Sequence, residues 1–526
     1  MGQKAMTLSG LDITILFIYL SGMVAMGIFF SGRNKSTEQY FVGGRSYNGW
    51  IVGLSMVGTS ISSITFLAYP ADGFKTAWLR YLPNLMMPLA VVFAAYFFLP
   101  FFKKTNITSA YEYLETRFGP SVRIYGAVTF IVAQLLRISI ILYLLSLLIH
   151  EITGLNELWS VFAGGAFVAV YTVLGGIDAV IWTDVIQTVI LMFGGVICIS
   201  IIINQLPGGL TQLFEVALAN NKLSFSELEN GRLQKVPWGF SLTNKTGLMM
   251  LVLGLSHWLQ EYGTNQNVIQ RYAATKNMAE ARKAMLVSML NVPIWAFYMF
   301  LGTALFVFFQ VFPTTEATEM LDGTRKAEQV LPFFIIHHLP SGVTGLIISA
   351  ALAAAMSSLD SSINAISTVG IHDIYRRHLA KGREDKHYLN MARAIATAAS
   401  LIMVGGAVVL IEAKTKTLQD TYTILLGFAA AGIFGLYMFG FFTTLKNTLA
   451  VWLALGATFS FSLWVVLASG GLLPQWMAVP FDLYYTSFLG HLGMFAVAVT
   501  ASLLLISRGK AEKNLAGLTV WTQTKK

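Results

Sequence analysis

The sequence predicts an all-α membrane protein that crosses the bilayer about thirteen times. Of its 526 residues, 55% are hydrophobic and only 12% are charged, and the mean hydropathy is +0.64. A soluble globular protein carries roughly 25% charged residues, so this chain has about half the usual share. Apolar segments of about 20 residues, the length that a helix needs to cross a bilayer, follow one another with short polar connections. We therefore expect one polytopic transmembrane domain over residues 1–526.

Each expected span is an apolar run of about 20 residues or more, bounded by polar or turn-forming residues. In chain order the runs cover 10–30, 49–70, 77–102, 122–150, 157–176, 180–205, 246–270, 284–312, 341–369, 389–411, 418–443, 448–469 and 486–507.

The positive charge of the chain follows a membrane topology. With the N-terminus outside, about two thirds of the lysines and arginines fall in cytoplasmic loops, among them Arg271 in the loop after the seventh span. The net charge of +9 is therefore distributed as the positive-inside rule requires, and it does not indicate a nucleic-acid partner. We expect a protein of the cell membrane with its C-terminus in the cytoplasm.

Two of the spans contain the marks of a broken helix. The second reads GLSMVGTSISSITFLAYP, with Gly53 and Gly58, and the seventh reads LGLSHWLQEYGTNQNVIQR, with Gly254 and Gly263. Since they are five spans apart, they run in opposite directions, which is typical of an inverted repeat with a midplane solute site. The alternative is that small and hydroxyl residues only pack these helices against their neighbours.

The ninth span carries an oxygen-rich stripe that indicates a cation site. Ser357, Asp360, Ser361 and Asn364 fall on one helical face because their offsets are 0, 3, 4 and 7. A carboxylate at membrane depth costs at least about 2.5–3.5 kcal/mol, so it has to face the bundle interior. Oxygen ligands suit small hard cations, and we expect Na⁺ as the coupling ion.

Other functional classes find little support in the residues. The sequence has no HExxH, GxSxG or Walker motif, so we expect no enzyme and no cofactor besides Na⁺. A channel would need a continuous polar lining, whereas the polar residues cluster at a few midplane points. A transporter-like sensor and a channel remain as alternatives to a symporter.

Several motifs of the chain resemble those of the sodium:solute symporter family. They are STEQYFVGGRS, SISSITF, ITSAYEYLETRFG, GGIDAVIWTDVIQ, NVIQRYAATKN and AAAMSSLDSSINAISTVGIHDIYRR, which span residues 36–377 in family order. The resemblance implies the leucine-transporter-like fold of two inverted five-helix repeats. We expect these core repeats at about 49–205 and 246–443, with peripheral helices at about 10–30, 448–469 and 486–507.

The resemblance also implies two sodium sites. The one shared across the fold maps to Gly58, Ile61, Ala354, Ser357 and Ser358. The second site, which only some members have, maps to Asp184, Ser358, Asp360 and Ser361. Here the chain departs from the sialic acid carriers, which have serine where this chain has Asp360. That carboxylate either strengthens a second cation site or pairs structurally with a lysine or arginine.

The solute contacts that the resemblance implies come from the second, third, fourth and seventh spans. They map to Ser60, Ser62, Thr65, Asn84, Arg137, Gln260, Glu261 and Tyr262. Arg137 is the most informative, because a guanidinium is always charged and its planar fork fits a carboxylate. Two other interpretations are an internal ion pair, for example with Glu261, and a cavity lining without a ligand role.

We therefore predict a sodium-coupled secondary active symporter that imports a small carboxylated sugar of the sialic acid or sugar acid class. A neutral sugar is the alternative solute, followed by a monocarboxylate or an amino acid. The expected partners are the solute, Na⁺ and the lipid bilayer, and no obligate protein partner is evident from the sequence.

Overall fold

The computed structural model describes residues 8–62, 64–103, 107–229, 231–412, 432–505 and 515–522. Within these residues the regular secondary structure is helical, apart from one antiparallel hairpin in which Ser226 pairs with Lys235 and an isolated bridge between Tyr47 and Thr275.

The longer helices and half-helices of the bundle are α1 (Gly10–Ser31), α3 (Gly49–Ser60), α4 (Tyr69–Lys75), α5 (Met87–Phe93), α6 (Leu99–Lys103), α8 (Pro120–Thr153), α9 (Glu157–Gln205), α11 (Gly247–Thr264), α12 (Gln266–Ala273), α13 (Met278–Val287), α14 (Asn291–Val311), α17 (Val343–Val369), α18 (Asp385–Glu412), α20 (Ile433–Phe442), α21 (Thr448–Ser469) and α22 (Thr486–Leu505).

The connecting elements are α2 (Thr37–Val42), η1 (Gly43–Arg45), η2 (Ile64–Ala68), η3 (Trp78–Met86), η4 (Ala94–Phe98), α7 (Glu112–Phe118), α10 (Gly209–Ala219), β1 (Ser226–Glu229), β2 (Arg232–Lys235), η5 (Ser288–Leu290), α15 (Thr315–Asp322), η6 (Ala327–Gln329), α16 (Val330–His338), η7 (Gly370–Leu379), η8 (Gln475–Met477) and η9 (Leu483–Tyr485).

The described residues contain nine helices that are long and apolar enough to cross a membrane, or up to ten if α3 and α4 form one bent span. The predicted number of about thirteen is therefore not confirmed. Helix α9 joins two expected spans in one helix of 49 residues, and α11 with 18 residues does not pass the same test. Of the expected span 418–443, residues 418–431 lie outside the described residues.

A glycine separates the two expected spans that α9 joins. Gly176 has φ 58° and ψ −161°, a conformation outside the helical range that L side chains rarely adopt. The amide of Asn34 donates to the carbonyl of Gly175 at 2.7 Å and to that of Leu174 at 3.3 Å. These bonds satisfy carbonyl groups next to the break, so the kink leaves them paired within the protein.

Both spans expected to be broken are interrupted. The first half of the second span, α3, ends at Ser60, Ile61 is extended, and the chain direction changes by 62° before α4. The seventh span breaks at Asn265, which is extended and whose side chain accepts from the Asn267 N–H at the start of α12. Gly254 lies within α11, where a Cβ atom would come within 2.3 Å of the Pro83 carbonyl oxygen.

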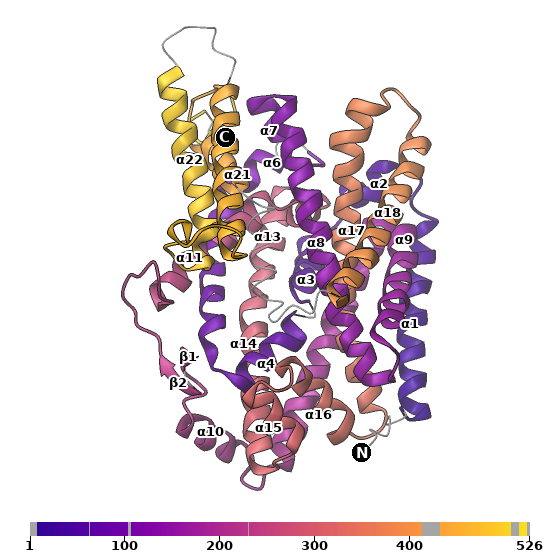
Figure 1. Ribbon diagram of the computed structural model, residues 1–526. Coiled ribbons are helices and arrows are strands. Elements are labelled where there is room, and N and C mark those ends of the chain that lie inside the picture. Colours follow the sequence, from indigo (N-terminus) through magenta and orange to yellow (C-terminus); the bar gives the residue numbers. More distant parts are fainter. Residues whose placement is uncertain are drawn as a thin grey trace.

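Helix α17 lies inside the bundle and packs against α9, α8, α1 and α3 (Figure 1). Almost all of its residues are buried, including its whole polar stripe. At its N-terminal end, the Asp12 carboxylate of α1 accepts from the N–H groups of Gly342 and Gly345, each at 2.7 Å. The carboxylate thereby satisfies free donors at the start of α17 and fixes the first helix to the ninth span.

The segments outside the long helices gather at the ends of the bundle. Helices α10, α15 and α16 and the hairpin lie at the end where the N-terminus is found, whereas α6 and α7 lie toward the opposite end (Figure 1). The described C-terminal residues pack at that opposite end, where the Val520 N–H donates to the Phe441 carbonyl at 2.9 Å.

Candidate functional site

The break after α3 brings backbone oxygens to the middle of α17. The Ser357 hydroxyl lies 3.0 Å from the carbonyl oxygen of Gly58, and 3.2 Å from those of Ile61 and Ala354. Ile61 is extended, which turns its carbonyl away from the helix ladder. Four of the five oxygens predicted for the shared sodium site therefore converge on one point. Carbonyls at an unwound helix are suitable ligands for Na⁺.

The fifth predicted ligand, Ser358, points to a neighbouring carbonyl. Its hydroxyl donates to the Thr59 oxygen at 3.1 Å, one residue from Gly58. The side chain of Thr59 points in another direction and lies 3.1 Å from the Ser361 hydroxyl. Consecutive residues at the end of α3 thus connect the shared site to a second polar cluster on α17.

The second cluster contains a buried ion pair. Arg271 on α12 donates from Nη2 to Asp184 Oδ2 on α9 at 2.9 Å, and both side chains are almost fully enclosed. Asp184 Oδ2 also accepts from the Ser55 and Thr59 hydroxyls, at 2.6 and 3.2 Å. The other carboxylate oxygen, Oδ1, is buried and has no partner within the described residues.

Arg271 uses its remaining donors within the same cluster. It donates to the Ser55 hydroxyl and to the Asn267 carbonyl, each at 3.0 Å, and it hydrogen-bonds to the Ser361 hydroxyl. The sequence-based assignment of Arg271 to a cytoplasmic loop is wrong, because α12 is buried along its whole length.

Asp360 is the second carboxylate of this cluster and is fully buried. It accepts from the Tyr171 hydroxyl at 3.0 Å, from the Ser361 hydroxyl at 3.2 Å and from the Thr183 hydroxyl at 3.4 Å. Among the described residues no lysine or arginine forms an ion pair with Asp360. The structural pairing considered from the sequence is thus made by Asp184, with Arg271, and not by Asp360.

A cavity of about 460 Å³ opens beside the break of the second span. Seven of the eight predicted solute contacts line it, namely Ser60, Ser62, Thr65, Asn84, Arg137, Gln260 and Glu261. Tyr262 does not line the cavity. It is buried, and its hydroxyl lies 2.8 Å from that of Ser288, which turns it away from the other residues.

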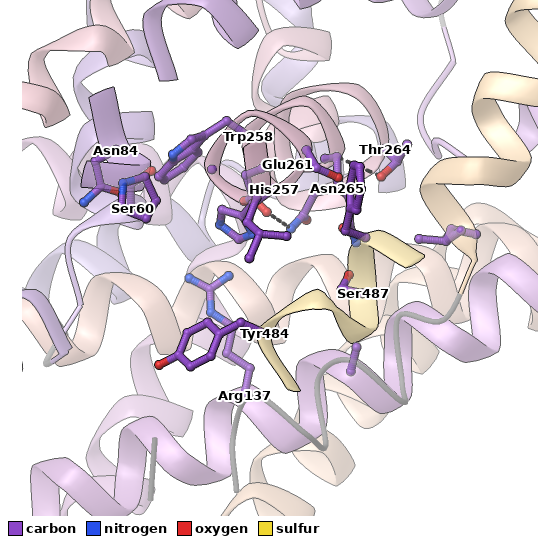
Figure 2. Close-up of a pocket in the computed structure, with 18 of the residues that line it drawn as sticks. Ser60, Asn84, Arg137, His257, Trp258, Glu261, Thr264, Asn265, Tyr484 and Ser487 are labelled. Atoms are coloured by element: carbon purple, nitrogen blue, oxygen red, sulfur yellow. Dashed lines mark hydrogen bonds between the residues drawn. The ribbon is translucent and has the colours of Figure 1, made fainter. Parts of the chain in front are cut away.

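Arg137 on α8 faces this cavity without a protein partner. No hydrogen bond or ion pair joins its guanidinium to any other residue in the described part of the chain, although the group acts electrostatically on His257. In Figure 2 the guanidinium points toward the His257 side chain. The carboxylate of Glu261 accepts from the Asn265 amide at 2.7 Å instead. The internal pair between Arg137 and Glu261, considered from the sequence, is therefore not formed.

The cavity wall also holds polar groups that the sequence did not single out as contacts. His257 and Asn265 come from α11 and from the break that follows it, and Tyr484 and Ser487 come from η9 and α22 (Figure 2). The indole of Trp258 stacks on Trp295 with ring centres 4.9 Å apart, and its buried N–H has no partner among the described residues. No spacing in the sequence connects η9 to α11, so Tyr484 was not predictable.

Comparisons with known proteins agree on one family. The sodium:solute symporter family matches residues 40–452. The chain is 32% identical over 466 residues to the sodium/sialic acid symporter NanT of Aliivibrio fischeri, covering 88% of this chain and 89% of the relative. It is also 32% identical over 442 residues to the sodium/sialic acid symporter SiaT of Proteus mirabilis, covering 83% and 86%.

The fold is similar to that of a solved transporter. A substrate-bound, outward-open Na⁺-coupled sialic acid symporter matches with a TM-score of 0.84 and 28% identity, over 96% of this chain and 100% of the other. This likeness confirms the predicted all-α transporter fold with inverted repeats.

Proposed function

Because this chain belongs to the sodium:solute symporter family and is a multi-pass, Na⁺-coupled solute symporter, we propose that it imports a small carboxylated sugar of the sialic acid class. Arg137 is the observation that carries the proposal. Arg137 is half-buried in the cavity wall, where its donors, unpaired within the described residues, are free to bind an anion or another strong acceptor. Since no described residue accepts from its guanidinium, a carboxylate of the solute is the partner that suits it.

The other solute contacts that we propose are the remaining cavity residues of the predicted set, Ser60, Ser62, Thr65, Asn84, Gln260 and Glu261. Their hydroxyl, amide and carboxylate groups suit the hydroxyls of a sugar, since each can donate or accept a hydrogen bond. Aromatic faces such as that of Trp258 add apolar contact area. Tyr262 is left out of this set because its hydroxyl is engaged with Ser288.

We assign the coupling Na⁺ to the carbonyl oxygens of Gly58, Ile61 and Ala354 with the hydroxyls of Ser357 and Ser358. These ligands come from the broken second span and from α17, so an ion there holds the two together. In alternating access, Na⁺ stabilises the outward-open state, and solute binding then permits closure. Each ligand has to raise the affinity for the other by the same factor.

A second Na⁺ at Asp184, Ser358, Asp360 and Ser361 shares this cluster with Arg271. Two ionised carboxylates and one guanidinium leave one negative charge in a buried site, and one Na⁺ neutralises it. The unpartnered Oδ1 of Asp184 is a suitable ligand atom. We propose that Arg271 neutralises the charge of Asp184, so that Asp360 supplies the negative charge that binds the second Na⁺.

For the topology, we propose that the N-terminus lies outside and the C-terminus in the cytoplasm of a cell membrane, with core repeats at about 49–205 and 246–443. Cysteine scanning with a membrane-impermeant maleimide tests this. A cysteine at Ser241 should react from outside in intact cells, whereas one at Lys381 should react only after lysis. The reverse pattern would contradict the proposed topology.

Uptake into proteoliposomes tests the solute assignment. With an inward Na⁺ gradient, the wild type should take up sialic acid. The methyl ester of sialic acid, which lacks the negative charge, should compete poorly with this uptake. In Arg137→Ala the two should compete almost equally, because the residue that distinguishes them is gone. Equal preference for acid and ester in the wild type, or tight uptake of a neutral sugar that Arg137→Ala does not weaken, would move the assignment to neutral sugars.

A further inference from the structure

One wall of the solute cavity comes from the C-terminal part of the chain. Leu483 and Tyr484 of η9 line it, together with Thr486, Ser487 and Phe488 at the start of α22. This segment lies beyond both predicted core repeats, in a helix that the sequence marked as peripheral. Residues that reach the solute therefore include some that the repeat architecture does not supply.

The same wall contacts a predicted solute ligand through a histidine. His491 Nε2 on α22 lies 2.9 Å from Gln260 Oε1 on α11, and the Ser487 hydroxyl lies 3.2 Å from the same nitrogen. His491 is only 5% exposed. Because a carboxamide oxygen only accepts, Nε2 carries the hydrogen of this bond.

This bond leaves the other end of the Gln260 amide free. Its amino group has no hydrogen-bond partner in the described part of the chain, and Gln260 is one of the residues that line the cavity. With the oxygen held by His491, the NH₂ end of the Gln260 side chain is the end that remains available to a solute in the cavity. A carboxamide without such a partner can present either its oxygen or its nitrogen to the solute, because only hydrogen bonding distinguishes its two ends.

The packing around His491 holds the histidine in place. A Cβ atom at Gly435 on α20 would come within 2.2 Å of the His491 carbonyl oxygen, so the backbones of α20 and α22 are in close contact. The His491 ring also meets the edge of Phe434 with ring centres 5.6 Å apart. Just before the start of α22, the hydroxyl of Tyr485 donates to the carbonyl of Ser241 at 2.8 Å, and Ser241 lies in the loop that leads into α11.

We propose that His491 is a positioning residue for the solute site. It holds Gln260 with its amino group toward the cavity, so that the transporter selects solutes that place an acceptor oxygen there, such as a hydroxyl, acyl or carboxylate oxygen. This rests on the proposed role of Gln260 as a solute contact. The selectivity of the site is then set partly by a helix outside the two repeats.

A double-mutant cycle tests the coupling. His491→Ala and Gln260→Ala should each raise the solute concentration for half-maximal uptake about 2- to 12-fold, the range for one neutral hydrogen bond. The double variant should be no worse than Gln260→Ala alone, since His491 acts through Gln260. Effects that simply multiply would overturn the proposal, because they mean that His491 contributes by packing.

Two further variants separate positioning from packing. His491→Gln keeps an N–H donor near the place of Nε2, and it should restore much of the lost solute affinity. Ser502→Ala is a matched control on the same helix, since Ser502 is buried and its hydroxyl has no partner among the described residues. It should leave half-maximal uptake unchanged. If His491→Gln is as impaired as His491→Ala while both melt like the wild type, the positioning role is wrong.

The readouts distinguish this proposal from the solute assignment. The wild type is first screened for Na⁺-dependent transport of a panel of acidic and neutral sugars. The mutant cycle is then measured with a transported solute, by uptake and by the melting temperature in the presence of that solute. Transport of a neutral sugar alone contradicts the proposed solute class but still permits the cycle. Independent effects at His491 and Gln260 contradict only the positioning role.

Discussion

Arg271 on α12 and Arg137 on α8 lie in opposite surroundings. Arg271 is buried among four partners, since it bonds to Asp184, Ser55, Ser361 and the Asn267 carbonyl. Arg137 faces a cavity of about 460 Å³, and no described residue pairs with it. The same cation is thus saturated at one site and left available at the other.

This difference separates a charge that protein groups satisfy from one whose donors remain available, and it is the basis on which we assign the solute carboxylate to Arg137. A buried guanidinium with a full set of acceptors gains little from a ligand, but its removal leaves a carboxylate unpaired. A half-buried guanidinium that faces a cavity without protein acceptors keeps its donors available for an anion. The presence or absence of partners among the described residues is therefore our reason for proposing Arg137, and not Arg271, as the arginine that binds the solute.

Loss of Arg271 should have the largest effect. Arg271→Gln leaves Asp184 as an uncompensated buried charge, so we expect about 3–5 kcal/mol of destabilisation and little transport. The melting temperature in detergent measures it. The double variant Asp184→Asn/Arg271→Gln should recover part of the stability because it removes both charges. An Arg271→Gln protein as stable as the wild type would contradict the structural role.

Loss of Arg137 should leave stability almost unchanged and affect the solute. Arg137→Ala should melt within a degree or two of the wild type, since no partner is left behind, and should bind the acidic solute about 10- to 150-fold more weakly. Arg137→Lys should rescue poorly because an ammonium group lacks the planar fork. Calorimetric titration with solute at saturating Na⁺ provides the measurement. A large drop in stability would instead indicate a hidden structural partner.

A smaller effect on transport is expected at the proposed shared Na⁺ site, whose ligands are uncharged carbonyl and hydroxyl oxygens. Ser357→Ala removes one hydroxyl oxygen from the proposed Na⁺ ligands around Gly58 and Ile61. It should raise the Na⁺ concentration for half-maximal uptake several-fold, because losing one polar contact to a charged group has an effect of that order. Ser349→Ala on the same helix is the control, because among the described residues that hydroxyl bonds only to the Gly345 carbonyl of its own helix. Uptake that proceeds equally in K⁺ would refute Na⁺ coupling at this site.

The smallest expected effect concerns the extra carboxylate. Asp360→Ser, which restores the serine of the sialic acid carriers, should keep transport active but lower the Hill coefficient for Na⁺ if a second ion binds there. Asp184→Ala should impair uptake more, because it also removes the partner of Arg271. Uptake measured against Na⁺ concentration decides between these outcomes. A Hill coefficient near one in the wild type and in both variants would make the cluster purely structural.

The sequence predicted the local features well and the long-range ones poorly. The stripe of Ser357 and Asp360 and the break after Ser60 follow from helical spacing and from glycine and serine content, so they were visible in the chain. The burial of Arg271 was not, because a charge count assigns a residue near the end of a span to the nearest loop. The contact of His491 with Gln260 joins helices about 230 residues apart, and no local pattern encodes it.

The bond from Asp12 to the start of α17 has a consequence for biosynthesis. The carboxylate and the Gly342 N–H that it accepts from are 330 residues apart in the chain. At a synthesis rate of roughly 5–20 residues per second, the first helix waits about 15 to 65 seconds for this partner. During that interval α1 lacks this contact, whereas its capping box between Ser9 and Asp12 and its packing against α9 do not depend on α17. The first helix of the chain therefore reaches this contact only after residue 342 has been made.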